Sequence, residues 1–173
     1  MTTKRKRYGI PEEVLKLLKP GMRVAVMGPP RTGKTTLADE IAEHLETDSV
    51  KHTGKRESTA ATNRSDPRHT DDLISRGWSQ ASDEASHWFD APGPWIIEGS
   101  MGVRAMRKWL KRNSGMPVDL VVWQRLAKVH RTKGQESMAK GTETIWKDVL
   151  PELLKRGVEV VTLTISPKPK DGS

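Results

Sequence analysis

The stretch from Gly28 to Thr35, Gly-Pro-Pro-Arg-Thr-Gly-Lys-Thr, constrains this chain more than any other. It matches G-x-x-x-x-G-K-[ST], the pattern of a phosphate-binding loop. In such loops backbone N–H groups surround the phosphates, the lysine reaches the outer oxygens and the hydroxyl ligates Mg²⁺. The pattern predicts a nucleoside triphosphate site. We expect its phosphate contacts from Gly28, Pro29, Pro30, Arg31, Thr32, Gly33, Lys34, Thr35 and Thr36.

The residues on either side of this loop have the patterns that the motif requires. Residues 22–27 form a short apolar run with β-branched members, which predicts a buried parallel strand. Residues 37–45 repeat apolar side chains at the spacing of a helix with one buried face. Such a helix would turn its N-terminal N–H groups and positive dipole end toward a polyphosphate.

The amino-acid composition of the chain excludes several classes of function. The chain has 173 residues and a net charge of +8, which raises the odds of a polyanionic partner. Cysteine is absent, which excludes a disulfide framework, a thiolate metal site and a cysteine nucleophile, and agrees with a reducing cytoplasm. No apolar run approaches the roughly 18 residues of a membrane span, and the first residues lead into charge. We therefore expect a soluble, cytoplasmic, unsecreted protein with no membrane partner.

Three further apolar runs read as strands, at 95–99, 118–123 and 158–165. Helical patterns at 102–112 and 134–156 separate them. This alternation predicts an α/β fold with a doubly wound parallel sheet flanked by helices, and a ligand at the carboxyl ends of the strands. We expect a single domain over 1–173, with a basic tail at 1–10 and a loose basic tail at 166–173.

The region around 47–69 is polar and basic and cannot bury much surface, so we expect a long loop or insertion there. A brief second strand fits either at Val50-Lys51-His52 or just before His69.

Two helices carry local expectations. A turn at 77–79 followed by a cap at Ser82 predicts a helix from there through Phe89. In the helix at 134–156, Gly141 and Pro151 predict an interruption or a kink.

Three carboxylates are candidates for the chemistry. Asp71 and Asp72 precede an apolar pair, where a helix-capping turn is a common explanation. Phosphoryl transfer, however, needs a group that orients the attacking hydroxyl and accepts its proton, and a second anionic group near Mg²⁺. We favour Asp71 for the first role. Glu98, at the carboxyl end of a strand, fits a magnesium ligand acting through water, or equally a hydrogen bond to the loop backbone.

Basic residues gather in two places. The helix at 102–112 carries a stripe at helical spacing, formed by Arg104, Arg107, Lys108 and Lys111. Four like charges gain nothing from each other, so the stripe is either a solvated face or a site for an external anion. Beyond the strand at 118–123 come Arg125 and Arg131, where a lid would stabilise charge on a transferring phosphoryl group; a basic loop without a catalytic part is the alternative.

Three stretches together carry a family resemblance. They are residues 28–36, the run 69–74 with Gly77-Trp78, and residues 95–99 leading into the basic stripe. They resemble the small P-loop kinases related to nucleoside and polynucleotide kinases. Within that group the chain is most similar to phage-encoded kinases that phosphorylate 5-hydroxymethyluracil in DNA during thymidine hypermodification. The resemblance spans most of the chain, and the phosphate loop is its specific part.

The resemblance implies a P-loop NTPase fold and ATP-dependent transfer of the γ-phosphoryl group to a hydroxymethyl group on a pyrimidine base in DNA. Lys34 would hold the β- and γ-phosphates, and Thr35 would ligate Mg²⁺ with Glu98 or Asp72 behind it. Asp71 would position the hydroxyl.

On the acceptor side, the resemblance implies that Arg125 and Arg131 neutralise developing charge. Arg104, Arg107 and Lys111, with the basic tail, would hold the DNA backbone. Because a base in a duplex is screened by stacking, it must be unstacked or reached in the major groove. Trp78 is our candidate for a stacking surface, with core packing as its alternative.

Two other functions fit the same motifs. A free nucleoside or nucleotide kinase would turn over small substrates with little dependence on salt. A non-kinase NTPase or a regulatory nucleotide-binding module would hydrolyse ATP slowly and tolerate Asp71→Asn. The sequence leaves the nucleotide preference and the oligomeric state open.

Overall fold

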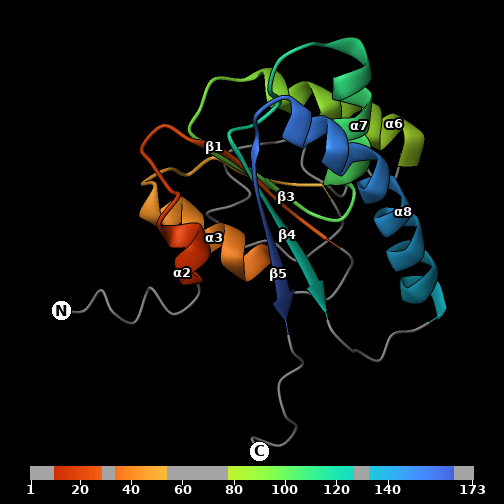
Figure 1. Ribbon diagram of the computed structural model, residues 1–173, viewed down its shortest axis with the longest axis horizontal. Coiled ribbons are helices and arrows are strands. Elements are labelled where there is room, and N and C mark those ends of the chain that lie inside the picture. The colour runs from red at the N-terminus through yellow and green to blue at the C-terminus, as the bar shows by residue number, and fades with distance from the viewer. Residues whose placement is uncertain (1–9, 29–33, 54–77, 127–132, 166–173) are drawn as a thin grey trace, which may run out of the picture.

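A computed structural model of the chain describes residues 10–28, 34–53, 78–126 and 133–165. At its centre lies a five-stranded sheet in the order β2-β3-β1-β4-β5, in which all strands run parallel (Figure 1). The strands are β1 (Arg23–Met27), β2 (Val50–His52), β3 (Trp95–Glu98), β4 (Leu120–Leu126) and β5 (Glu159–Ile165). Helices cover both faces, so the predicted doubly wound α/β fold is confirmed.

One face of the sheet is covered by α2 (Glu12–Leu15) and α3 (Lys34–His44). Alternate residues of β1 and β3, such as Val24, Val26 and Ile96, point to this side and pack against Ile41 of α3. The predicted helical face of residues 37–45 is buried here. The first of the two possible second strands, at 50–52, is the one that forms.

The opposite face is covered by α6 (Trp78–Ser86), the 3₁₀ turn η2 (His87–Asp90), α7 (Gly102–Arg112) and α8 (Lys133–Lys155). The larger core cluster lies here and holds all five tryptophans whose side chains are described. They are Trp88, Trp95, Trp109, Trp123 and Trp146. The last two stack with ring centroids 4.3 Å apart. None of the five is exposed enough to offer a stacking surface.

The strand order makes the carboxyl end of β1 a switch point. From β1 the chain passes through α3 to β2 on one side, and after β3 it crosses through α7 to β4 and β5 on the other. In open α/β sheets, ligands bind in the crevice outside the strand ends at such a point. Gly28, the first residue of the predicted phosphate loop, directly follows β1 there.

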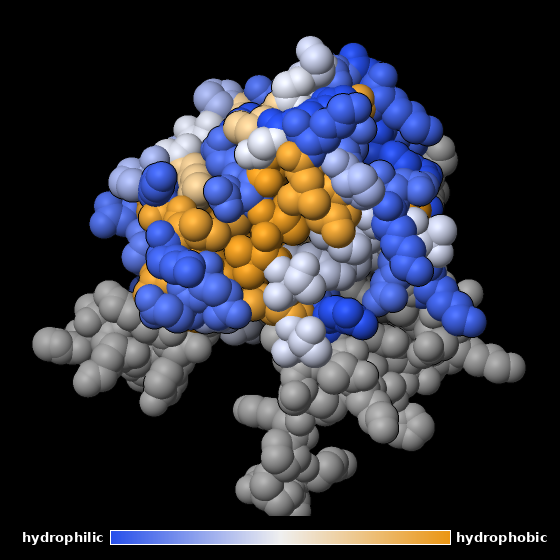
Figure 2. All heavy atoms as spheres, viewed as in Figure 1, coloured by the Kyte–Doolittle hydropathy of each residue, from blue (hydrophilic) through white to orange (hydrophobic). Residues whose placement is uncertain are grey.

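Strand β5 forms one edge of the sheet. In Figure 1 this strand lies toward the viewer. Figure 2, in the same view, shows apolar residues gathered in the middle of this face with hydrophilic residues around them. Among the positions of β5 whose burial is described, the exposed ones are polar, namely Glu159, Thr162 and Thr164. Polar edge positions limit pairing with other strands.

The predicted start of α6 was wrong. Trp78 and Ser79 already belong to the helix, and Ser82 lies in its interior at 2% exposure rather than at its cap. Buried Ala81 and Ala85 give the segment a helical face that begins earlier than the turn pattern indicated. The α-helix ends at Ser86, and the 3₁₀ turn replaces its predicted continuation to Phe89.

The predicted interruption of α8 is also absent, because the helix continues through Gly141 and Pro151. Ile145, Val149 and Leu153 form one buried face that continues past Pro151, which is itself exposed. A Cβ atom at Gly141 would lie 3.3 Å from the Arg104 guanidinium of α7, which is the movable end of a long side chain. Within the described ranges, no helix is long and apolar enough to cross a membrane.

Candidate active site

The entry to the predicted phosphate loop requires glycine. Gly28 has a φ of 149°, and a Cβ atom there would overlap the backbone carbonyl oxygen of Gln124 in β4. The backbones of β1 and β4 therefore approach too closely for any other residue. The predicted phosphate contacts Pro29, Pro30, Arg31, Thr32 and Gly33 lie outside the described residues.

The first residues of α3 place three predicted contacts at the switch point. Lys34 is the first residue of the helix and is 8% exposed, Thr35 is half-buried, and Thr36 is exposed. An ammonium group at the positive end of a helix gains nothing from the helix dipole. A bound polyphosphate would relieve this, since helix N-termini favour anions.

Glu98 joins this group from β3. It is the last residue of the strand and is 4% exposed. On β3 it shares a sheet face with Ile96, the face that α3 covers. The Thr35 hydroxyl donates a hydrogen bond to Glu98 Oε2 at 3.3 Å. Two residues that the sequence predicted as magnesium ligands, 63 positions apart, therefore lie in contact.

His52 is a site residue that the sequence analysis missed. It ends β2 in register with Glu98, is 3% exposed, and places Nδ1 2.5 Å from Glu98 Oε2. Thr53 then donates from its backbone N–H and its hydroxyl to the Glu98 carbonyl oxygen, at 2.9 and 3.2 Å. A polar residue ending a possible strand was the available signal, but the register that sets it beside Glu98 is not readable from the sequence.

The oxygen atoms at this site suit Mg²⁺ better than they suit a metal whose ligands all come from the protein. No group of three or more His, Cys, Asp or Glu side chains that could hold a metal occurs within the described ranges. Mg²⁺ usually takes one or two protein oxygens and completes its shell with waters and substrate phosphates. The Thr35 hydroxyl and the Glu98 carboxylate are such a pair. Asp72, the other predicted metal ligand, and Asp71 lie outside the described residues.

Arg125 lies inside β4 rather than in a segment beyond it, so this part of the prediction was wrong. The strand is longer than its apolar run because β5 supplies partners through Leu126, and Arg125 pairs in register with Thr164. Its side chain is exposed beside a groove of about 380 Å³ on the α8 side of the sheet. Arg131, the second predicted lid arginine, falls in the part of the chain not described.

The basic stripe runs along α7, away from the carboxyl ends of the strands. Arg104 lies in the first turn, and Lys111 lies seven residues later, about 10 Å along the axis at 1.5 Å per residue. Burial, and secondarily the charge of Arg107, lower the pKa of Arg104. Arg107 forms a long ion pair with Asp148 of α8, at 3.9 Å. An acid from another helix therefore neighbours the stripe, although none is interleaved along it.

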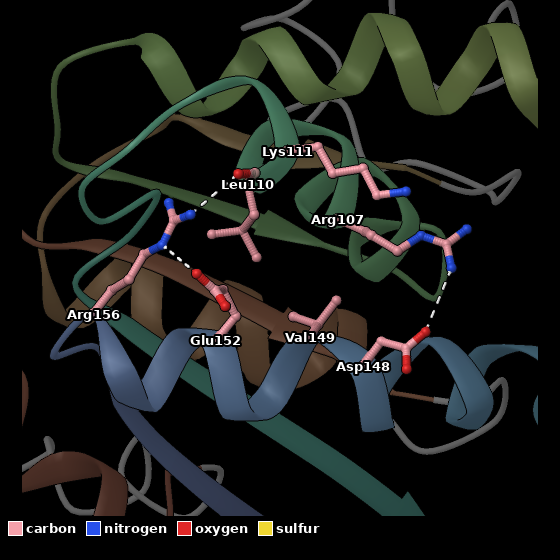
Figure 3. A pocket seen from close by; sticks show the side chains of 7 residues that line it. All are labelled: Arg107, Leu110, Lys111, Asp148, Val149, Glu152 and Arg156. Carbon is pink, nitrogen blue, oxygen red and sulfur yellow. Dashed lines mark hydrogen bonds and ion pairs between the residues drawn. The ribbon is translucent and has the colours of Figure 1, made fainter.

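Beside the far half of the stripe lies a groove of about 420 Å³ between α7 and α8 (Figure 3). Its lining carries both signs of charge, from Arg107, Lys111, Asp148, Glu152 and Arg156. Arg156 is bound to Glu152 Oε2 and to the Leu110 carbonyl oxygen, both at 3.1 Å. These contacts stabilise the helix pair. The side chain of Trp78, which begins α6, is not among those described.

No model of a known protein family matches the chain, and no curated protein is significantly similar to it. The likeness to P-loop kinases therefore depends on the motif residues and on where the fold places them.

Proposed function

We propose that this chain is an ATP-dependent phosphotransferase that phosphorylates the hydroxymethyl group of 5-hydroxymethyluracil in DNA. The observation that carries the proposal is the hydrogen bond between Thr35, in the phosphate-loop motif, and the buried Glu98, at the switch point of a parallel sheet. P-loop enzymes hold Mg²⁺ with these two kinds of residue, a loop hydroxyl and a strand-end carboxylate.

In this proposal the nucleotide half of the site is built on the N-terminus of α3. Lys34 and the helix N–H groups bind the β- and γ-phosphates. Thr35 and Glu98 would hold Mg²⁺, with Asp72 as a second candidate ligand, and the bound ion would supply positive charge to the phosphate oxygens. The close approach of Gly28 to Gln124 fixes where the loop leaves the sheet.

In the proposed phosphoryl transfer one bond to phosphorus forms and one breaks. The hydroxymethyl oxygen bonds to the γ-phosphorus, the bond from that phosphorus to the β–γ bridging oxygen breaks, and ADP leaves. Asp71 accepts the hydroxyl proton. Arg131 compensates charge on the phosphoryl group. The roles of Asp71 and Arg131 are predictions from the sequence alone.

The basic stripe supports an extended acceptor. Arg104, Arg107 and Lys111 spread over about 10 Å of α7, a span that suits contacts to a nucleic acid backbone. The helix starts at Gly102, soon after Glu98, so a strand of DNA along it would pass the proposed site. A target base has to leave the stack, and Trp78 is the candidate to hold it.

The test is to supply ATP labelled in the γ-phosphate together with hydroxymethyluracil DNA, unmodified DNA, or free hydroxymethyldeoxyuridine. We expect label only in the hydroxymethyluracil DNA, and none when Lys34→Ala replaces the parent protein. Affinity for that DNA should fall steeply between 50 and 200 mM salt, as it does for proteins with several phosphate contacts. Label only on the free nucleoside would overturn the acceptor, and label only in inorganic phosphate would overturn the kinase.

A further inference from the structure

His52 and Glu98 form a buried pair that joins two strands at the proposed metal site. Their side chains are 3% and 5% exposed, and Nδ1 lies 2.5 Å from Oε2. The same Oε2 accepts the hydrogen bond from Thr35. His52, Glu98 and Thr35 therefore form one contiguous polar cluster from β2, β3 and α3.

The imidazole makes its contact to Glu98 through one nitrogen only. If Nδ1 donates to Glu98, the proton of the neutral ring lies on Nδ1, and Nε2 carries a lone pair. Nε2 is buried and has no hydrogen-bond partner among the described residues. The ring is therefore oriented by Glu98, and Glu98 in turn is restrained by the ring.

We propose that His52 is a positioning residue that holds the Glu98 carboxylate against the Thr35 hydroxyl, so that Mg²⁺ binds tightly together with the nucleotide. This inference rests on the proposed function. A glutamate side chain has three rotatable bonds, and the His52 contact removes much of that freedom before the metal arrives. Partners of metal ligands typically contribute about 10- to 100-fold in metal affinity.

Three substitutions separate this role from simple core packing. His52→Asn places an amide N–H close to the position of Nδ1 and should keep the bond to Glu98. His52→Gln carries its amide at about the position of Nε2, and His52→Leu has no donor. His87→Gln is the matched control, because His87 is an exposed histidine of η2 that makes a long contact with Asp90, at 4.0 Å.

The measurement is the affinity for an ATP analogue with a non-transferable γ-phosphate, by calorimetry, with Mg²⁺ and with a chelator. For His52→Gln and His52→Leu we expect the gain in affinity from Mg²⁺ to shrink by about tenfold or more. Affinity without Mg²⁺ should stay within about threefold. His52→Asn should keep most of the gain, and His87→Gln all of it.

Two results would overturn the inference alone. One is an unchanged Mg²⁺ gain in His52→Gln and His52→Leu. The other is an equal loss in all three His52 variants that follows their thermal stability, because that is what a packing role predicts. If His52→Leu does not fold, the comparison of His52→Asn with His52→Gln decides. A parent protein that binds no analogue under either condition would instead overturn the proposed function, and the inference with it.

Discussion

The two ends of the sheet use their polar residues differently. At the amino end, Arg23 donates to Asp119 from its backbone N–H, Nε and Nη2, at 2.8, 3.2 and 3.1 Å. Near the same end, Arg156 binds Glu152 and three backbone carbonyl oxygens at the end of α7, from Leu110, Asn113 and Gly115. These side chains satisfy one another and lie partly exposed.

At the carboxyl end the described polar residues are more deeply buried. Glu98 and His52 are both less than 5% exposed, and His52 Nε2 has no partner among the described residues. Burying polar groups costs free energy unless they are fully hydrogen-bonded. The amino end is thus built for stability, whereas the carboxyl end tolerates costly groups, as sites that bind charged ligands do.

Of the substitutions that compare the two ends of the sheet, Lys34→Ala should have the largest effect. Because the ammonium group would contact the phosphates being separated, we expect the rate of ATP consumption to fall by about a thousandfold or more. Steady-state assays with the parent protein measure this. The control Lys155→Ala, an exposed lysine at the end of α8, should change the same rate by less than twofold. Equal rates for Lys34→Ala and the parent would contradict the claim that the carboxyl end of the sheet is the functional one.

A matched pair of carboxylate substitutions, one at each end of the sheet, tests the same difference. Glu98→Gln should lower ATP consumption at fixed Mg²⁺ by about a hundredfold, since an amide is a poor partner for a hydrated divalent cation. Asp119→Asn should leave activity per folded molecule unchanged and lower the free energy of unfolding by about 1–3 kcal/mol, because it breaks a charged hydrogen-bond pair. Activity assays and urea unfolding of both variants separate the two effects. A reversed pattern would show that the functional end had been misassigned.

Two glycines with positive φ give a second pair. Gly28, with φ 149°, has no room for a Cβ atom against Gln124, whereas Gly115, with φ 90°, has nothing within 4 Å. Gly115→Ala should cost about 1 kcal/mol of stability from backbone strain. Gly28→Ala should cost about 3 kcal/mol or more, because a backbone clash adds to the strain. Chemical denaturation measures both, and equal costs would mean that β1 and β4 do not approach so closely.

The smallest effect concerns pH. Burial alone would raise the pKa of Asp119, but hydrogen bonds and charge from Arg23 outweigh it and leave this pKa below its ordinary value. The stabilisation is therefore full above the unfolded-state pKa of about 3.9 and is lost as pH falls through the lower folded-state pKa. Between pH 6 and pH 3, the unfolding free energy should therefore fall more in the parent than in Asp119→Asn, as urea unfolding at each pH would measure. Parallel curves would contradict this.

The parts of the fold that depend on local pattern were predictable from the sequence. The helix at 102–112 and the strand ending at Glu98 have nearly the predicted bounds, because the helix has one buried face at helical spacing and the strand is a short continuous apolar run. The position of Glu98 at the site followed from placing it at the carboxyl end of a strand beside the phosphate loop, whereas its role beside Thr35 came from the family resemblance, which left Asp72 as the alternative. The bounds and the position of Glu98 needed only the chain's own apolar pattern and the rule for ligand position.

What was missed depends on contacts between distant residues. His52 becomes a site residue only through the register of a three-residue strand with Glu98, 46 positions away. Arg125 joins β4 because β5 supplies a partner, although the apolar run ends at Trp123. Ser82 lies inside α6 because tertiary burial of Ala81 and Ala85 outweighs its preference for a cap. Roles for Asp71, Asp72 and Arg131 stay predictions.

The central claim is that a triphosphate lies on the N–H groups between β1 and α3. Amide hydrogen exchange of the parent protein, with and without ATP and Mg²⁺, tests it most directly. We predict that slowing of exchange on binding is largest in peptides covering residues 28–36 and that Lys34→Ala abolishes it. Unchanged exchange in those peptides at saturating ATP, or protection only elsewhere in the chain, would contradict the account.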